Sequence, residues 1–330
     1  MRSLTGAFVC ALFLAGAVVV PATPGQVAAK AKKDDKGKKK RRGPTLEYEK
    51  FRRTREVDIQ MREKRAAIRK QLEQLLQYEK DDKERPALLF RLAENYFEEA
   101  TAFFNQAMRL DEKVAKDPTN ERLRAEVARQ KKALRAKEDE WRAKAIDQYK
   151  TIITKYTNYP DLDQVYFYLA QSLWDLKRQK EGLATYRQLI KNYPRSKYVP
   201  DAYLAFGEYY FDSAKLEKAL MAYKKVAEYK EAEIYPYALY KQGWCYYNLH
   251  EWDKAKEMFS SVIYLYDMGS GAGSRRIELR KEALHDFVQT YGHEGSASAA
   301  PRVFKRLAPK EAHGMLVNLA GLYFGEGQAK

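Results

Sequence analysis

Small and hydrophobic residues recur along residues 160–268 in a pattern that predicts three pairs of helices. The copies align at Ala170, Gly207 and Gly243, each in the middle of a predicted first helix, and these residues are 37 and then 36 positions apart. Counting from each of them, Leu or Tyr follows after three positions, a small residue after twelve, an aromatic ring after sixteen and an aliphatic residue after nineteen. A period of this length is typical of helix-turn-helix repeats and not of repeated strands.

The residue types in the pattern explain how each pair would pack. Small residues let the two backbones approach at the helix crossing, and the rings fill the space around it. Pro200 and Pro236 stand where first helices would begin, the position at which a missing N–H costs least. The sequence Asn192–Pro194 ends the preceding helix, because the residue before a proline disfavours helical geometry.

This set of positions resembles the tetratricopeptide repeat family. The stretch "NYPRSKYVPDAYLAFGEYYF" is similar to its bacterial cell-envelope members, namely the Tol-Pal-associated repeat protein, the repeat lipoprotein of outer-membrane β-barrel assembly and gliding motility repeat proteins. The resemblance implies an all-α, right-handed superhelical solenoid of helix pairs. It also implies a non-enzymatic scaffold that binds envelope proteins or peptides, without choosing among these machines.

In the family, the first helices of the repeats line a groove that binds partners. Transferring those positions implies a partner-binding groove made of Phe167, Gln171, Trp174, Asp175, Leu204, Glu208, Phe211, Asp212, Tyr240, Trp244, Tyr247 and Asn248. Rings in such a groove would serve as anchors, and the Asp and Asn side chains would hydrogen-bond an extended backbone or basic side chains. The alternative is that the rings pack against neighbouring helices, since aromatic stripes are often core.

Two helical segments are predicted before the repeats. Residues 45–84 lack glycine and proline and form an amphipathic helix, which either caps the array or dimerises as a coiled coil; its apolar stripe is Ile68, Leu72, Leu75 and Leu76. Residues 85–159 are predicted to form an expanded first hairpin with its tip at 117–121. Thr119 or Asn120 could cap the returning helix there.

Residues 269–330 continue the pattern loosely. A flexible, glycine-rich loop comes first, and its spacing does not match a phosphate-binding motif. A degenerate repeat follows, with Leu284, Val288 and Tyr291 on one helix and Ala300, Phe304 and Leu307 on the next. The last segment places Leu316, Leu319, Ala320 and Tyr323 at first-helix positions of an incomplete terminal repeat. Three explanations fit this unpaired helix: the repeat array is truncated, the helix docks on another molecule, or it folds back on Phe304 and Leu307.

The first residues resemble a targeting segment. Residues 1–29 combine one arginine, an apolar run and small residues up to Ala29, which predicts a signal peptide and a periplasmic or outer-membrane-associated protein. Cys10 lacks the motif of a lipoprotein cleavage site. Residues 30–44 are predicted to be a basic disordered linker, in which Lys30 to Arg42 carry nine Lys or Arg and two Asp. This charge could contact anionic surfaces, or it could hold an uncleaved anchor with the body in the cytoplasm.

Composition narrows the chemistry. The 330 residues are 45% hydrophobic and 32% charged, which is enough chain for an elongated repeat array with a continuous core. The formal net charge is +16. No nucleic-acid partner is expected, because no aromatic residue interleaves the basic segment. Cys245 has no partner cysteine after cleavage and is read as a buried apolar residue.

Enzymatic groups are also missing from the pattern. The four histidines at 250, 285, 293 and 313 lack metal-ligand spacing and are expected in exposed turns or loops. No catalytic residue, metal, cofactor or small-molecule substrate is therefore predicted. The alternatives are a cytoplasmic or membrane-anchored adaptor, and an accessory factor of peptidoglycan remodelling, which would need a carboxylate pair or metal cluster in the groove.

Overall fold

The computed structural model of the protein describes residues 46–268 and 274–325, and every regular element in these ranges is an α-helix. The described chain forms two compact units, divided between Pro160 and Asp161. The predicted signal peptide, basic linker and glycine-rich loop (269–273) lie outside the described residues. No helix among the described residues is long and apolar enough to cross a membrane.

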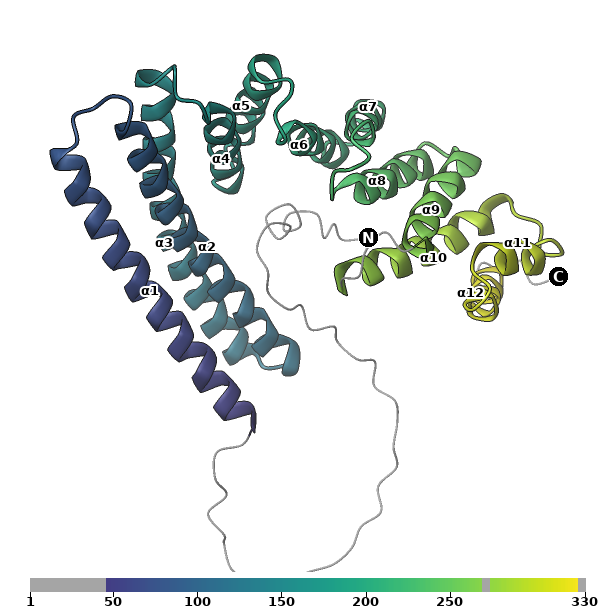
Figure 1. Cartoon of the computed structure of the whole chain (residues 1–330). Coiled ribbons are helices and arrows are strands. Elements are labelled where there is room, and N and C mark those ends of the chain that lie inside the picture. The colour runs from purple at the N-terminus through teal and green to yellow at the C-terminus, as the bar shows by residue number, and fades with distance from the viewer. Residues whose placement is uncertain (1–45, 269–273, 326–330) are drawn as a thin grey trace, which may run out of the picture. The chain divides into compact units, whose positions relative to one another are not determined.

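Unit 1 consists of three long helices, α1 (Leu46–Tyr78), α2 (Arg85–Lys116) and α3 (Glu121–Lys155), which lie side by side (Figure 1). The predicted hairpin is formed by α2 and α3. Asn120 caps α3 by accepting a hydrogen bond from the backbone N–H of Leu123 at 2.9 Å, as the sequence indicated. At the base of the hairpin, the rings of Phe90 and Tyr149 lie 5.9 Å apart.

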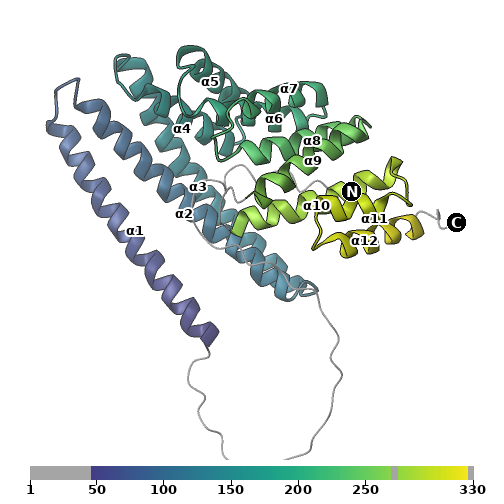
Figure 2. The same cartoon turned by 45° about the vertical axis from the view of Figure 1, so that its right-hand side comes forward.

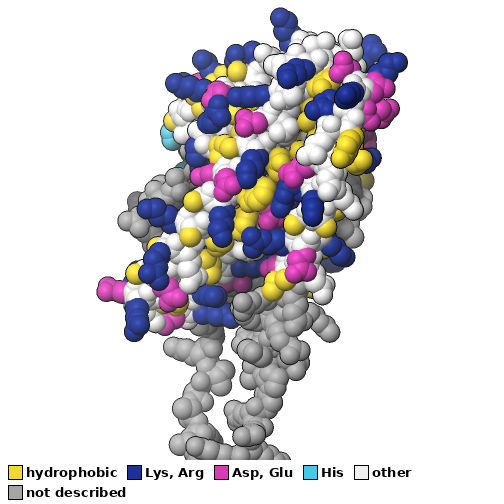
Figure 3. Space-filling view, turned by 90° about the vertical axis from the view of Figure 1, so that its left-hand side faces the viewer, with side chains coloured by type: hydrophobic (Ala, Val, Ile, Leu, Met, Phe, Trp, Pro, Cys, Tyr) yellow, Lys and Arg dark blue, Asp and Glu magenta, His cyan; other side chains and the backbone are white. Residues whose placement is uncertain are grey.

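Helix α1 packs on α2 through charged side chains as well as apolar ones. Leu72 is buried, and Arg65 Nε donates to Glu99 Oε2 at 2.7 Å, although Glu99 is only 2% exposed. Two residues of the predicted stripe, Ile68 and Leu75, are instead about half exposed, at 49% and 53%. Hydrophobic side chains are visible between charged ones on this side of the molecule (Figure 3). Helix α1 therefore packs on α2 within unit 1 and leaves an apolar flank at the surface.

Unit 2 contains the repeats as successive helix pairs (Figure 2). The first pair is α4 (Leu162–Asp175) with α5 (Gln179–Asn192), the second is α6 (Val199–Asp212) with α7 (Leu216–Ala227), and the third is α8 (Tyr235–Asn248) with α9 (Trp252–Asp267). Pro200 and Pro236 lie in the first turns of α6 and α8, and α5 ends at Asn192, as predicted.

The turns inside the three helix pairs share the same geometry. Lys177, Ala214 and His250 all adopt a positive φ, of 61°, 54° and 61°. The next backbone N–H donates to the carbonyl five residues earlier, the bond that closes a helix end of this kind. These bonds join Arg178 to Leu173, Lys215 to Tyr210 and Glu251 to Tyr246 at 2.8 to 2.9 Å. The turn residues have the 37- and 36-residue spacing of the sequence repeat.

Aromatic rings seal the helix crossings. The ring of Tyr223 on α7 lies against Gly207 on α6, and a Cβ added at Gly243 on α8 would stand only 2.6 Å from Cε1 of Phe259 on α9. Ala219, Tyr223 and Phe259 are fully buried. Glycine is required at both crossings because any side chain would displace the ring.

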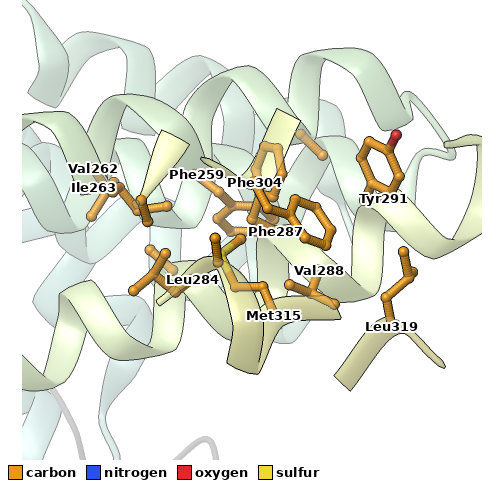
Figure 4. Close-up of a cluster of buried hydrophobic side chains, with 14 of the residues drawn as sticks. Phe259, Val262, Ile263, Leu284, Phe287, Val288, Tyr291, Phe304, Met315 and Leu319 are labelled. Carbon is orange, nitrogen blue, oxygen red and sulfur yellow. The ribbon is translucent and has the colours of Figure 1, made fainter. Parts of the chain in front are cut away.

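The pattern continues through α10 (Ser274–Glu294), α11 (Ala300–Leu307) and α12 (Ala312–Gly325). Figure 4 shows the core that joins α9 to these helices, with Phe259, Phe287, Phe304 and Met315 converging. The rings of Tyr291 and Phe304 lie 5.1 Å apart, so the degenerate repeat packs as the sequence indicated.

Candidate functional site

The twelve predicted groove residues lie on the first helices α4, α6 and α8, but they differ in exposure. Four are buried: Phe167, Gln171, Leu204 and Glu208. Six are partly buried: Trp174, Asp175, Phe211, Tyr240, Trp244 and Tyr247. Asp212 and Asn248 are exposed. The four buried residues belong to the interior of the unit and present no surface to a partner.

Contacts with other parts of unit 2 explain the burial of Phe167 and Leu204. The ring of Phe167 stacks on Tyr198, with centroids 4.5 Å apart and planes 17° from parallel. Leu204 packs in the cluster that surrounds Tyr223. For these positions, the packing interpretation of the aromatic stripe describes the molecule better than the groove interpretation does.

A buried polar cluster joins the second repeat to the third. Glu208 Oε1 accepts a hydrogen bond from the Tyr223 hydroxyl at 2.7 Å, and Glu208 Oε2 lies 3.3 Å from Lys241 Nζ. Lys241 is only 8% exposed, and its ammonium group lies 4.0 Å from the centroid of the Phe211 ring. Burial and the adjacent Glu208 carboxylate raise the pKa of Tyr223, so the hydroxyl remains a donor. Sequence reasoning identified Glu208 but missed its partner Lys241.

Hydrogen bonds also tie α8 to α10. The Tyr240 hydroxyl donates to Asp286 Oδ2 at 2.6 Å, and the Tyr247 hydroxyl lies 3.0 Å from His293 Nε2. Burial raises the pKa of Asp286, whereas the bond from Tyr240 acts in the opposite direction. Tyr240 is therefore engaged in the fold, and the part of it that a partner could reach is limited.

A cluster of rings at the turn after α8 was not predicted. Trp252 stacks on His293 with centroids 4.1 Å apart, and His250 stands edge-on to Trp252 at 5.0 Å. All four histidines are exposed as expected, but only His250 lies in a turn. His285 and His293 lie on α10 and His313 lies on α12, which corrects the expected loop positions.

Six of the partly buried or exposed groove residues recur with the repeat. Near the end of each first helix, an aromatic side chain is followed by an acid or an amide: Trp174 with Asp175, Phe211 with Asp212, and Tyr247 with Asn248. Asn248 Nδ2 donates to the Trp244 carbonyl at 2.7 Å, which orients the amide. We call these six residues the aromatic row.

No arrangement for catalysis is seen in the described part of the chain. No group of three or more His, Cys, Asp or Glu side chains there could hold a metal ion. Cys245 is fully buried, and burial raises the pKa of its thiol to about 12, so that the thiol remains protonated at neutral pH. A protonated, buried thiol is not a nucleophile.

Comparisons with known proteins agree with the helix pairs. A tetratricopeptide repeat model matches residues 164–196 and 237–267, which cover most of α4 with α5 and of α8 with α9. These two segments therefore match tetratricopeptide repeats. A search of curated proteins found no match.

Among solved structures, the chain is similar to the C-terminal part of a TPR repeat-containing protein from Cytophaga hutchinsonii. The sequence identity is 15% and the TM-score is 0.35. The match covers 71% of this chain and 95% of the other.

Proposed function

We propose that the protein is a non-enzymatic scaffold of a bacterial cell-envelope complex and that it binds partner proteins along the aromatic row. Tetratricopeptide repeats suggest a scaffold for protein–protein interaction. The observation that carries the choice of surface is the repetition of an aromatic residue followed by Asp or Asn at the ends of α4, α6 and α8. Because this surface recurs with the repeat, a partner whose contact residues recur at the same spacing can bind along it.

The row suits an extended peptide. Packed helices lie about 8 to 10 Å apart, and an extended chain advances roughly 3.3 Å per residue, so one peptide side chain in about three would meet a ring. Partly buried rings lose little conformational entropy on binding, which makes them good anchors. Asp212 and Asn248 are exposed and can accept hydrogen bonds from the peptide backbone.

The cell-envelope assignment rests on the first 42 residues and on resemblance. The signal-like segment 1–29 would direct export, and the basic segment from Lys30 to Arg42 would hold the mature protein near anionic head groups. Candidate machines are a Tol-Pal-like system, β-barrel assembly and gliding motility. N-terminal sequencing of the mature protein, combined with cell fractionation, distinguishes export from a cytoplasmic or membrane-anchored adaptor.

Photo-cross-linking in intact cells tests the binding surface. A photoreactive phenylalanine analogue in place of Asp212 is expected to cross-link to a partner protein, because this position is exposed beside Phe211. Mass spectrometry identifies the captured protein, which is then purified. Phe211→Ala should weaken its affinity about thirtyfold, which corresponds to an anchor worth about 2 kcal/mol.

The matched control position is Met221 on α7, which is 69% exposed and lies outside the aromatic row. The analogue at Met221 should not capture the same protein. Equal capture from both positions, or unchanged affinity after Phe211→Ala in a folded protein, would remove the aromatic row from consideration as the binding surface.

A further inference from the structure

Helix α12 is packed on one face only. Met315 and Leu319 point into the core shared with α9, α10 and α11 (Figure 4). On the opposite face, Val317 is 57% exposed and Phe324 is 79% exposed. A Cβ added at Gly321 would meet nothing within 4 Å, so this face carries a large exposed ring beside open space.

The preceding repeats show what normally fills such a space. On α8, the ring of Phe259 from α9 lies over Tyr240, Gly243 and Trp244, with ring centroids 5.7 Å from Tyr240 and 6.2 Å from Trp244. The ring therefore packs against three residues of the first helix: the crossing residue, the residue three positions before it and the residue one position after it. On α6, Tyr223 occupies the same three positions, lying against Gly207 and bonding Glu208.

The same three positions of α12 are open. Tyr323 corresponds to Tyr246, three residues after the crossing residue, which places Ala320 at the crossing. The socket for an incoming ring then consists of Val317, Ala320 and Gly321. Val317 and the glycine are the exposed residues described above, and Ala320 is exposed as well.

Helix α12 also carries the complementary half of this interface. In each second helix, a small residue stands four positions before the ring that enters the socket, as in Ala219 with Tyr223 and Ala255 with Phe259. Helix α12 has Ala320 four positions before Phe324. It therefore combines the socket of a first helix with the ring of a second helix.

We propose that two copies of this chain pair through α12, antiparallel, with Phe324 of each copy in the Val317–Ala320–Gly321 socket of the other. The contact uses the same crossing of a ring on a small residue that joins α8 to α9. Helix α12 contains no Lys, Arg, Asp or Glu, so like charges do not oppose the pairing. Other helices of a second copy cannot supply the ring for this socket. Their corresponding rings, including Tyr223, Phe259 and Phe304, are fully buried in their own copy.

The expected dimer is weak. With position 324 of one copy opposite position 320 of the other, residues 319–325 of the two copies face each other. This contact is about 10 Å long, so it buries less area than a standard stable interface. Dissociation in the micromolar range or above follows from this size. The surface lies outside the aromatic row, so the dimer and the proposed partner binding can fail independently.

Sedimentation velocity of the full chain, measured from micromolar to several hundred micromolar, tests the proposal. The wild-type mass should rise toward that of a dimer with concentration. Phe324→Ala removes the ring, and Gly321→Leu fills the socket while favouring the helix. Each change should weaken self-association at least tenfold, and circular dichroism should show that both variants remain helical.

Ala184→Leu is the matched control, because Ala184 is an exposed small residue on α5. This variant should associate as the wild type does. A wild-type protein that stays monomeric throughout overturns the proposal. Association that persists in both α12 variants also overturns it and transfers the contact to another surface, such as the exposed flank of α1.

Discussion

Tyr223→Ala should lower the free energy of unfolding by about 3 to 5 kcal/mol, the range for removing a buried aromatic side chain. Tyr223 is fully buried against Gly207, and its loss leaves a cavity at the crossing of α6 and α7. The change also removes the hydroxyl that donates to Glu208 at 2.7 Å. Urea denaturation followed by circular dichroism measures the effect.

Two further variants separate the contributions to this loss. Tyr223→Phe keeps the ring and removes only the hydrogen bond to Glu208, which should cost about 1 to 3 kcal/mol. Tyr264→Ala removes a ring that is 64% exposed on α9 and should change stability by about 0.5 kcal/mol or less. If Tyr223→Ala proved as mild as Tyr264→Ala, the ring-on-glycine crossing would not be what holds the repeat together.

Lys241→Met should destabilise the protein by about 3 to 5 kcal/mol, because it leaves the buried Glu208 carboxylate without its cation. The two charged groups lie 3.3 Å apart, and each side chain is 10% exposed. Adding Glu208→Gln to this variant removes the unpaired charge while keeping an acceptor for Tyr223. The double variant should therefore recover most of the lost stability, as thermal denaturation would show.

The control for this pair is an ion pair at the surface. Lys225 and Glu228 lie 2.8 Å apart, but their side chains are 53% and 59% exposed. Lys225→Met should cost less than about 1 kcal/mol, since water screens exposed pairs. A similar cost for Lys225→Met and Lys241→Met would contradict the burial argument, and so would a double variant no more stable than Lys241→Met.

Sequence alone was sufficient for the repeat register because that register depends on local chemistry. Small residues at Gly207 and Gly243 were predicted at the helix crossings, and the structure places rings directly against them. Prolines near helix starts and Asn120 as a cap are also local signals. The positive φ values were not predicted, because Lys177, Ala214 and His250 are not glycines.

The exposure of the groove residues could not be predicted because it depends on side chains far away in the sequence. Phe167 is covered by Tyr198, and Glu208 is paired with Lys241 on the next first helix. A helical period assigns a residue to a face, but it does not show which neighbour covers that face. In α1, by contrast, Arg65 helps to form the packed face through its hydrogen bond to Glu99. A sequence pattern that assigns every charged residue to the solvent does not predict this role.

Indole N–H nuclear magnetic resonance tests the central claim, that partners bind along the aromatic row, most directly. Of the four tryptophans in the chain, Trp174 belongs to the aromatic row, and Trp244 lies beside it, with its ring centroid 5.2 Å from that of Tyr247. Trp141 lies on α3 in unit 1. The titrant is the protein captured from position 212. We predict that the signals of Trp174 and Trp244 shift on saturation while that of Trp141 does not. Binding that leaves both first-helix signals unchanged would contradict the account.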